Sequence, residues 1–170
     1  ADELARLESE DNGKPIALAR RMDVPRAILN FRFFATAILH AETPCHVTDD
    51  RALNYTLRQP LGVAGLISPW NLPLYLLSWK IAPAIAAGNC CVAKPSELTP
   101  YSAFAIALLG EEAGLSAGVL NIVMGDAESI GRVLTEDPRI AKFTFTGSTP
   151  VGKKLGAQCA TTVKRVSLEL

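Results

Sequence analysis

Hydrophobic and polar positions change their period about a third of the way along the chain. Before that point, apolar residues recur three and four positions apart, which is the spacing of an amphipathic helix. After it, short continuous apolar runs alternate with helix-period segments. Such an alternation is typical of a parallel sheet that is covered on both faces. The pattern predicts an α/β protein with a five-stranded parallel sheet and helices on both faces, preceded by a mostly helical N-terminal segment.

Two helices are predicted in the N-terminal segment. The first covers residues 1–9, and the sequence Asn-Gly-Lys-Pro at 12–15 is expected to stop it. The second begins near Asp23, with Pro25 in its first turn. Its expected buried stripe consists of Ile28, Phe31, Phe34, Ile38 and Leu39.

The remainder of the chain is predicted to alternate between strands and helices. After a loop at 43–51, the predicted strands are 55–58, 62–67, 89–94, 119–124, 140–145 and 163–170. The predicted helices are 74–87, 99–114, 126–134 and 147–158. Pro83 is expected to bend or restart the first of these helices. Thr99 and Asp126 are expected to cap the second and the third.

Composition narrows the classes of partner. Seventeen basic and seventeen acidic residues cancel, so the overall field attracts neither nucleic acid nor an anionic membrane. Hydrophobic residues make up 49% of the chain, as expected of a folded globular protein. The longest apolar stretch, 81–87, is far shorter than the ~20 residues that span a bilayer. We therefore expect neither nucleic acid nor a membrane as a partner.

The four cysteines show neither a CxxC pair nor a histidine at metal-ligand spacing. They are Cys45, Cys90, Cys91 and Cys159. We interpret them as small buried hydrophobes of a reducing, cytoplasmic protein without a metal site. The polar, helix-patterned N-terminus predicts no signal peptide. Because the chain also lacks an initiator methionine, we expect a fragment of a longer protein.

A rigid turn follows the predicted strand 62–67. Trp70 and Asn71 stand between Pro69 and Pro73, and the two prolines stiffen the backbone. A side-chain amide held in this way can donate a hydrogen bond to a developing oxyanion. The alternative is that Asn71 caps the following helix and that Trp70 is a packing residue.

Lys94 and Glu97 follow the next strand, where Pro95 directs the chain away from the sheet. The carboxyl ends of parallel strands commonly form a ligand crevice. A carboxylate there can accept hydrogen bonds from both hydroxyls of a ribose, and it repels a 2′-phosphate, which favours NAD over NADP. The alternative is a solvated charge pair at the start of a helix.

The glycine-containing turn at 147–152 joins a predicted strand to a helix, and its free backbone N–H groups predict an anion site. Residues 147–153 also fit G-x-x-x-x-G-K, but the next residue of a P-loop must be Ser or Thr to hold Mg²⁺, and it is Lys154. Thr149 stands where G-x-G-x-x-G requires its second glycine. The sequence favours the phosphate-binding turn of a variant dinucleotide fold over a P-loop NTPase.

Glu169 lies between two leucines in the last predicted strand. A carboxylate at this position is either exposed at the edge of the sheet or lodged in a cleft, where it can act as a general base. The sequence pattern leaves both interpretations open.

Six short motifs occur in register along the chain. They are Glu10–Pro15 (EDNGKP), Pro60–Val63 (PLGV), Pro69–Pro73 (PWNLP), Lys94–Glu97 (KPSE), Phe145–Ser148 (FTGS) and Leu168–Leu170 (LEL). In this order they resemble the NAD(P)-dependent aldehyde dehydrogenase superfamily, and in particular the hydroxymuconic and aminomuconic semialdehyde dehydrogenases. The resemblance implies a Rossmann-like NAD-binding domain at 61–170. It also implies an N-terminal helical segment at 1–60 that holds the start of the oligomerisation strands.

The resemblance implies roles that the pattern only permits. Asn71 would stabilise the oxyanion of a thiohemiacetal, and Glu169 would be the general base that activates water for thioester hydrolysis. Lys94 and Glu97 would hold the adenosine ribose, and Ser148 would contact the pyrophosphate. The expected cofactor-binding residues are Ser68, Pro69, Trp70, Lys94, Ser96, Glu97, Gly125, Gly147, Ser148 and Val151.

The implied reaction is attack of a cysteine thiolate on an aldehyde, hydride transfer to NAD, and hydrolysis to a carboxylic acid. In the family, the nucleophilic cysteine lies in a later segment, and none of the four cysteines here matches its motif. We expect the chain to be the cofactor-binding portion of a homo-oligomeric enzyme and to be inactive alone. The alternative is a stand-alone nucleotide-binding module without catalysis.

Overall fold

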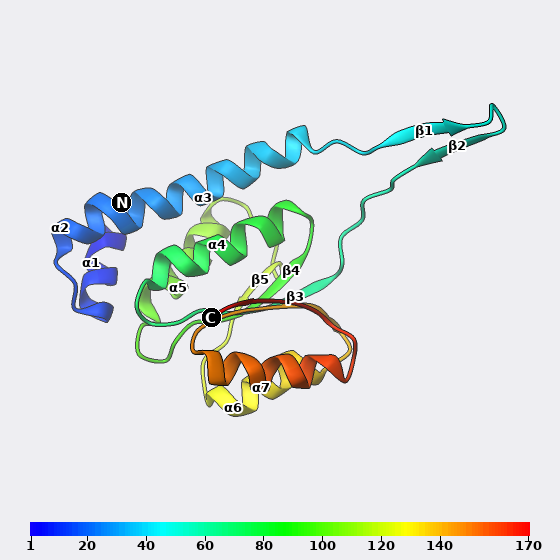
Figure 1. Ribbon diagram of the computed structural model, residues 1–170. Helices are drawn as coiled ribbons and strands as arrows, with labels where there is room; N and C mark the ends of the chain where they lie inside the picture. The colour runs from blue at the N-terminus through cyan, green and yellow to red at the C-terminus, as the bar shows by residue number, and fades with distance from the viewer.

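A five-stranded parallel sheet forms the centre of the protein in a computed structural model that describes residues 1–170 (Figure 1). The strand order is β5-β4-β3-β6-β7. The strands are β3 (Val63–Ile67), β4 (Cys90–Lys94), β5 (Leu120–Ile122), β6 (Ile140–Thr146) and β7 (Arg165–Glu169). All five predicted strands of the sheet are therefore confirmed, with ends that differ by a few residues.

Helices cover both faces of this sheet. They are α4 (Pro73–Ala86), α5 (Tyr101–Glu112), α6 (Ala127–Glu136) and α7 (Thr149–Ala160). In Figure 1, α4 and α5 lie on one face together with the N-terminal helices, and α6 and α7 lie on the other. The predicted α/β class, with a parallel five-stranded sheet and a helical N-terminal segment, is confirmed.

The order of the strands reverses between β3 and β6. The chain runs outward from β3 through β4 to β5, then returns to place β6 on the other side of β3. Ile67, at the end of β3, pairs with Lys94 of β4 and with Phe145 of β6. Open α/β sheets bind ligands at the carboxyl ends of the strands that flank such a reversal. The topology therefore directs attention to the residues that follow these three strand ends.

The N-terminal helices pack on the sheet domain. They are α1 (Asp2–Asn12), α2 (Ile16–Leu18), a π-helical turn η1 (Ala19–Asp23), α3 (Val24–Ala37) and a 3₁₀ turn η2 (Ile38–His40). Gly13, with a φ of 76°, ends α1 as the sequence predicted. The predicted start of a helix near Asp23 is confirmed, since α3 begins at Val24 with Pro25 in its first turn, although the helical turns from Ile16 to Asp23 that lead into it were not predicted.

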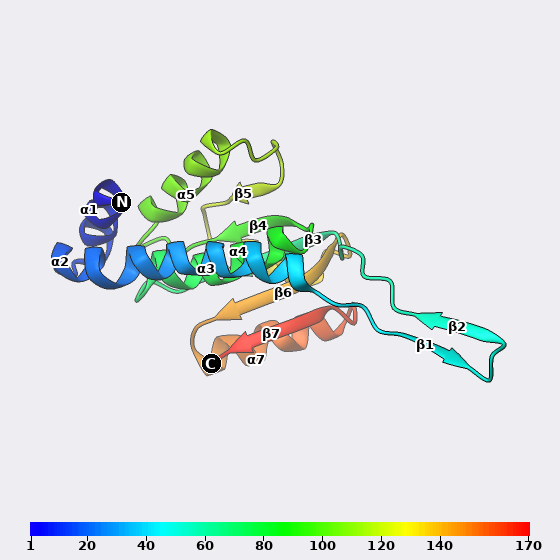
Figure 2. The ribbon, with the colours of Figure 1, turned by 90° about the horizontal axis from the view of Figure 1, so that it is seen from above.

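The predicted buried stripe of α3 is only partly correct, since Phe31 and Phe34 are half-buried. Ile28, Ile38 and Leu39 are exposed, whereas Ala27 and Asn30 are buried. The helix lies along α4 (Figure 2). The fully buried residues of α3 lie on the side that packs against its neighbours. The small side chain of Ala27 permits close packing, and Asn30 Nδ2 donates to Ser78 Oγ at 2.9 Å. Hydrophobicity alone cannot indicate which face of a helix has a neighbour.

A two-stranded hairpin projects from the body of the protein (Figures 1 and 2). It consists of β1 (Cys45–Thr48) and β2 (Ala52–Tyr55), which are antiparallel. The prediction of a loop at 43–51 and a strand at 55–58 is therefore wrong. Asp49 and Asp50 adopt positive φ values of 50° and 53°, which suit the tight turn of a hairpin. Aspartate carries a weaker turn signal than glycine, so the sequence pattern did not reveal this turn.

Two further helix predictions need correction. Pro83 lies inside α4, which continues through it without a restart. Thr99 does not cap α5, because its buried hydroxyl has no hydrogen-bond partner. Instead, Asp11 at the end of α1 accepts a hydrogen bond from the Tyr101 N–H at 2.6 Å. The predicted cap of α6 is confirmed, since Asp126 accepts from the Ser129 N–H at 2.7 Å.

Buried apolar side chains form one cluster on each face of the sheet. The larger cluster joins residues of α1 and α3, such as Ala5 and Ala27, to Leu66 of β3 and Ile81 of α4. The first helices thus share a core with the sheet. The smaller cluster lies between the sheet and α6 and α7, around Phe143.

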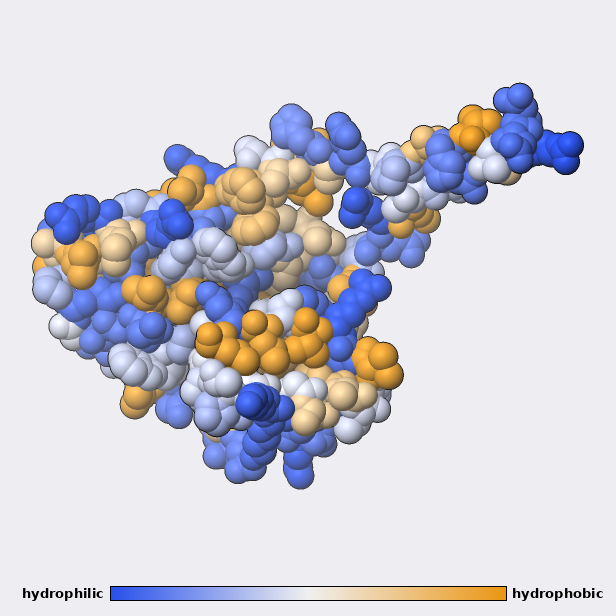
Figure 3. Space-filling view, viewed as in Figure 1, coloured by the Kyte–Doolittle hydropathy of each residue, from blue (hydrophilic) through white to orange (hydrophobic).

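The edge strand β7 carries exposed apolar side chains. Figure 3 shows hydrophobic side chains gathered in a band at the front of the molecule, where β7 forms the edge of the sheet. Leu168 is 37% exposed and Leu170 is 56% exposed. Such a strand edge is a potential surface for further pairing. Among the helices, none combines the length and apolar character that a bilayer crossing requires.

Candidate functional site

A cleft opens where β3, β4 and β6 end, at the reversal of the strand order. We call it the switch-point cleft; its cavity volume is about 480 Å³. Nine of the ten cofactor-binding residues that the resemblance implied line this cleft: Ser68, Pro69, Trp70, Lys94, Ser96, Glu97, Gly147, Ser148 and Val151. Gly125 does not line it and lies in the turn between β5 and α6.

Lys94 and Glu97 form an ion pair at the floor and rim of the cleft. Lys94 Nζ lies 3.0 Å from Glu97 Oε2 and also donates to the Pro95 carbonyl at 3.1 Å. The Lys94 side chain is 3% exposed and that of Glu97 is 57% exposed. The Glu97 backbone N–H and the Lys94 ammonium hold the pKa of the Glu97 carboxyl below its usual value. A lysine buried to this degree is not part of a solvated ion pair on the surface. The geometry therefore favours a ligand-binding site.

The turn between β6 and α7 brings backbone N–H groups to the same cleft. A Cβ at Gly147 would lie 2.4 Å from the Phe145 ring, so a larger residue here would require the ring or the turn to shift. The first turn of a helix leaves N–H groups without intrahelical partners, and it favours negative charge. Lys154 pairs with Glu128 at 2.5 Å on the rim of the cleft and is no substitute for a P-loop hydroxyl. The arrangement suits a pyrophosphate without a bound metal.

Trp70 is 57% exposed and lines the cleft, so it is not a core packing residue. Its ring and Pro69 form part of the wall that the switch-point cleft shares with a second cavity. This wall joins the two cavities into one continuous surface.

The second cavity contains both candidate catalytic residues. We call it the Asn71–Glu169 pocket; besides the shared residues Pro69, Trp70, Thr146 and Gly147, Asn71 and Glu169 line it. These two side chains come from positions almost a hundred residues apart in the sequence. A side-chain amide and a carboxylate therefore line one pocket that adjoins the switch-point cleft.

Asn71 does not cap the helix that follows it. The residue at the N-cap of α4 is Leu72, without a side-chain cap. Glu8 of α1 takes that place instead, because its Oε2 accepts from the Leu74 N–H at 3.2 Å. The alternative interpretation of Asn71 is thereby removed, and its exposed amide remains available to a ligand.

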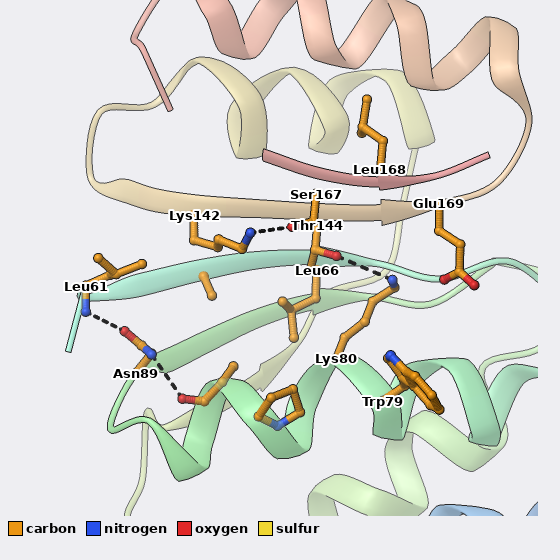
Figure 4. Close-up of a pocket in the computed structure, with 13 residues that line it drawn as sticks. Leu61, Leu66, Trp79, Lys80, Asn89, Lys142, Thr144, Ser167, Leu168 and Glu169 are labelled. Atoms are coloured by element: carbon orange, nitrogen blue, oxygen red, sulfur yellow. Dashed lines mark hydrogen bonds between the residues drawn. The ribbon is translucent and has the colours of Figure 1, made fainter. Parts of the chain in front are cut away.

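Glu169 is exposed on the edge strand β7 and is anchored by one hydrogen bond. Thr146 Oγ1 donates to Glu169 Oε2 at 2.8 Å. Lys80 Nζ in turn donates to Thr146 Oγ1 at 2.7 Å. Figure 4 shows Lys80 rising from α4 towards the sheet and Glu169 reaching from β7 on the same side. A buried ammonium, a hydroxyl and a carboxylate thus form a line that ends at the Asn71–Glu169 pocket.

Burial lowers the pKa of Lys80, while the nearby Glu169 carboxylate partly opposes this shift. Lys80 is 6% exposed. The sequence interpretation did not select Lys80 or Thr146. A signal for Lys80 was present, because it is the only charged residue of the apolar segment 73–87. Thr146 gave no such signal, since a threonine at a strand end is common.

None of the four cysteines lies in the site. Cys45 is exposed on the hairpin, so the prediction that all four cysteines are buried is wrong for this residue, while the other three lie in β4 and α7. Burial raises the pKa of the Cys91 thiol to about 12 and also raises the pKa of Cys159. Because the thiolate is the reactive form, these buried thiols are poor nucleophiles. No cluster of residues suited to a metal ion is present either.

The fold and the two connected cavities define an α/β protein with a ligand cleft at the point where the strand order of a parallel sheet reverses. Comparison with known proteins gives the family: residues 1–170 match the aldehyde dehydrogenase family, and the chain belongs to it. The similarity noted in the six motifs is thereby confirmed.

The relatives are longer than this chain. The 2-aminomuconic semialdehyde dehydrogenase of Bos taurus is 53% identical over 170 residues, which cover 99% of this chain and 35% of that protein. Among solved structures, a putative aldehyde dehydrogenase from Burkholderia cenocepacia matches with a TM-score of 0.96 and 46% identity, over 99% of this chain and 35% of that one. PnpE from Pseudomonas sp. WBC-3, in complex with nicotinamide adenine dinucleotide, matches with a TM-score of 0.95 and 43% identity, over 99% and 34%. The chain therefore spans about a third of the length of the relatives it matches.

Proposed function

We propose that the chain is the cofactor-binding and oxyanion-binding portion of an NAD-dependent enzyme that oxidises an aldehyde or semialdehyde to a carboxylic acid. The observation that carries this proposal is the joint placement of Asn71 and Glu169 in one pocket, which shares a wall with the switch-point cleft. Membership of the family and the NAD complex of a 43% identical relative support it.

In this proposal each group has a distinct task. Lys94 and Glu97 bind the ribose hydroxyls, and the N–H groups at the start of α7 bind the pyrophosphate. The Asn71 amide donates to the oxyanion that forms when a cysteine thiolate attacks the aldehyde carbon. Bound in the switch-point cleft, NAD would supply the hydride acceptor for that carbon. Glu169 then takes a proton from a water molecule, whose oxygen attacks the thioester and releases the carboxylic acid and the thiol.

The nucleophilic cysteine must come from a part of the parent protein outside these 170 residues. The exposed thiol of the hairpin lies away from the pocket, and buried thiols such as Cys91 are unreactive. The test is a direct assay. The full-length parent should form NADH with an aldehyde, and the isolated chain should form none. Aldehyde oxidation by the isolated chain would contradict the proposed division of labour.

The alternative is a nucleotide-binding module without catalysis, since the whole switch-point cleft lies within this chain. Calorimetric titration of the isolated chain with NAD addresses it. Saturable binding together with an inactive full-length parent would favour the module. Saturable binding with an active parent would fit the enzyme portion.

A preference for NAD over NADP follows from Glu97. Its carboxylate stands at the rim of the cleft and is held ionised beside Lys94. A negative charge that binds a ribose diol repels a 2′-phosphate. Changing Glu97 to Gln in the full-length enzyme should therefore raise KM for NAD about tenfold and lower KM for NADP. Steady-state kinetics with both cofactors measures this. If the ratio of the two kcat/KM values is unchanged, Glu97 does not set the preference.

The substrate class is suggested by a third cavity, whose lining includes Leu72, the residue that follows Asn71. We call it the Arg26 pocket; its volume is about 460 Å³, and Arg21, Arg26, Leu72 and Tyr75 are among its lining residues. Arg26 Nη2 lies 3.3 Å from Tyr75 Oη, and its guanidinium lies 5.3 Å from the centre of the Tyr75 ring. Guanidinium groups bind carboxylates in a bidentate manner. A semialdehyde whose far end carries a carboxylate fits this pocket, in agreement with the name of the Bos taurus relative.

Changing Arg26 to Leu in the full-length enzyme should raise KM for an acidic semialdehyde about 10- to 100-fold, because a charge-assisted hydrogen bond is lost. KM for an uncharged aldehyde of similar size should change less than about twofold. Arg32 to Leu is a matched control, since Arg32 is exposed on the same helix and does not line the pocket. Equal effects of Arg26 to Leu on both aldehydes would contradict the carboxylate role.

We further propose that the segment up to residue 60 contributes to a homo-oligomer through the β1–β2 hairpin. All residues from 41 to 62 are exposed, and an isolated two-stranded hairpin gains little stability by itself. Contact with another copy would cover its exposed apolar side chains, such as Leu53 and Tyr55. Sedimentation of the full-length protein without residues 45–55 should show smaller particles than the intact protein. Unchanged particles would contradict this assignment.

A further inference from the structure

The turn that carries Asn71 has few backbone hydrogen bonds of its own. Residues 70–72 belong to no helix or strand. The carbonyl groups of Trp70 and Asn71 accept no backbone N–H, and the first such bond of this region joins the Leu76 N–H to the Leu72 carbonyl at 2.9 Å. Because an amide that must meet an oxyanion needs a fixed position, something outside the turn has to hold it.

The N-terminal helix α1 supplies those contacts. Asn12, its last residue, donates from Nδ2 to the Trp70 carbonyl at 2.7 Å and to the Asn71 carbonyl at 3.3 Å. One side-chain amide therefore fixes two successive peptide units across 58 and 59 positions of sequence. Glu8, one helical turn earlier, holds the Leu74 N–H on the other side of the same turn.

The position of Asn12 is itself fixed. Gly13 ends α1 in the left-handed conformation, and its N–H bonds to the Ser9 carbonyl at 2.9 Å. The side chain of Lys14 points back into the protein, where its Nζ lies 3.4 Å from Glu8 Oε1 and 3.1 Å from Asp23 Oδ1. All three of these charged side chains are less than 10% exposed. The pairs tie α1 to η1, so that Asn12 projects from a rigid base.

We propose that Asn12 is a positioning residue that acts on the reaction through Asn71. The inference rests on the proposed function, in which the Asn71 amide stabilises the oxyanion. Asn12 does not line the Asn71–Glu169 pocket, and it touches the backbone of the turn rather than any reacting atom. Without these two hydrogen bonds, no other donor holds the Trp70 and Asn71 carbonyls. The side-chain amide of Asn71 would then no longer be held in the position that the oxyanion requires.

A double-mutant cycle in the full-length enzyme tests this inference. Asn12 to Ala should lower kcat about 10- to 100-fold, the size of effect that a small misplacement of a catalytic group produces. In an Asn71 to Ala background the same change should lower kcat less than about twofold, because the group it positions is gone. Asn12 to Asp, which keeps the shape but cannot donate, should behave like Asn12 to Ala and provides a second variant if the alanine variant folds poorly.

Ser9 to Ala is the matched control. It removes the hydrogen bond from Ser9 Oγ to the Lys14 carbonyl at 2.7 Å, at the same helix end, without touching the turn at 70–72. It should leave kcat unchanged. Additive effects of the Asn12 and Asn71 changes would overturn the inference and leave the proposed function intact. An Asn71 to Ala variant with normal kcat would overturn the oxyanion role of Asn71, and with it the positioning role of Asn12.

Discussion

Replacing Asn71 with Ala in the full-length enzyme is expected to lower kcat by about 10²–10³-fold, the usual cost of removing one oxyanion donor. The expectation rests on the exposed amide of Asn71 in the pocket it shares with Glu169, and on the finding that it caps no helix. The loss should appear in kcat, with KM for the aldehyde nearly unchanged, because the donor meets its charge only after the thiolate attacks.

The dissociation constant for NAD provides the control for this variant. The residues that line the switch-point cleft do not include Asn71, so NAD binding measured by fluorescence or calorimetry should stay within about twofold of the unchanged enzyme. Weakened NAD binding together with lost activity would indicate a disturbed turn rather than a lost donor. A kcat within twofold of normal would remove Asn71 from the mechanism.

Replacing Glu169 with Gln is expected to slow hydrolysis of the thioester by about 10²–10⁴-fold, the range attributed to a positioned general base. Gln retains an oxygen that can accept the hydrogen bond from Thr146 Oγ1, so the strand end should keep its geometry. The earlier steps do not need the carboxylate in this mechanism. The variant should therefore form about one NADH per active site rapidly and then turn over slowly.

Stopped-flow absorbance of NADH distinguishes this outcome from a general loss of structure. A burst followed by slow turnover supports the role of Glu169 in hydrolysis, whereas a slow first turnover shows that it acts earlier. Glu136 to Gln is a suitable control, since Glu136 is exposed at the end of α6 and lines neither cavity. The control should show full turnover without a burst phase of its own.

The site extends beyond the residues that the sequence singled out. Nine of the ten expected cofactor residues line one cleft, and the two expected catalytic residues line the adjoining pocket. These positions follow strand ends, and local patterns mark strand ends well. Lys80, Thr146 and Asn12 were not selected for these roles. Each acts across the fold, through partners between 23 and 66 positions away.

Two of the errors in the fold share one cause. Local hydrophobic spacing predicted a broad buried stripe on α3, but the neighbour α4 covers only the strip around Ala27 and Asn30. Likewise, Thr99 has the right residue type for a helix cap, yet Asp11 reaches α5 from another helix and holds the Tyr101 N–H. In both cases the deciding partner is distant in sequence.

The sequence by itself determined the α/β class, the five strands of the sheet, and the polar groups that follow them, because these depend on periodicity and on residues near the strand ends. The tertiary structure alone decided that Asn71 lines one pocket with Glu169 rather than capping a helix. It also decided that Glu8 and Asn12 hold the turn at 70–74 through hydrogen bonds, and that Lys80 donates a hydrogen bond to Thr146. Hydrogen bonds between distant segments form only when packing brings donors and acceptors within about 3 Å of each other, and no local pattern encodes that approach.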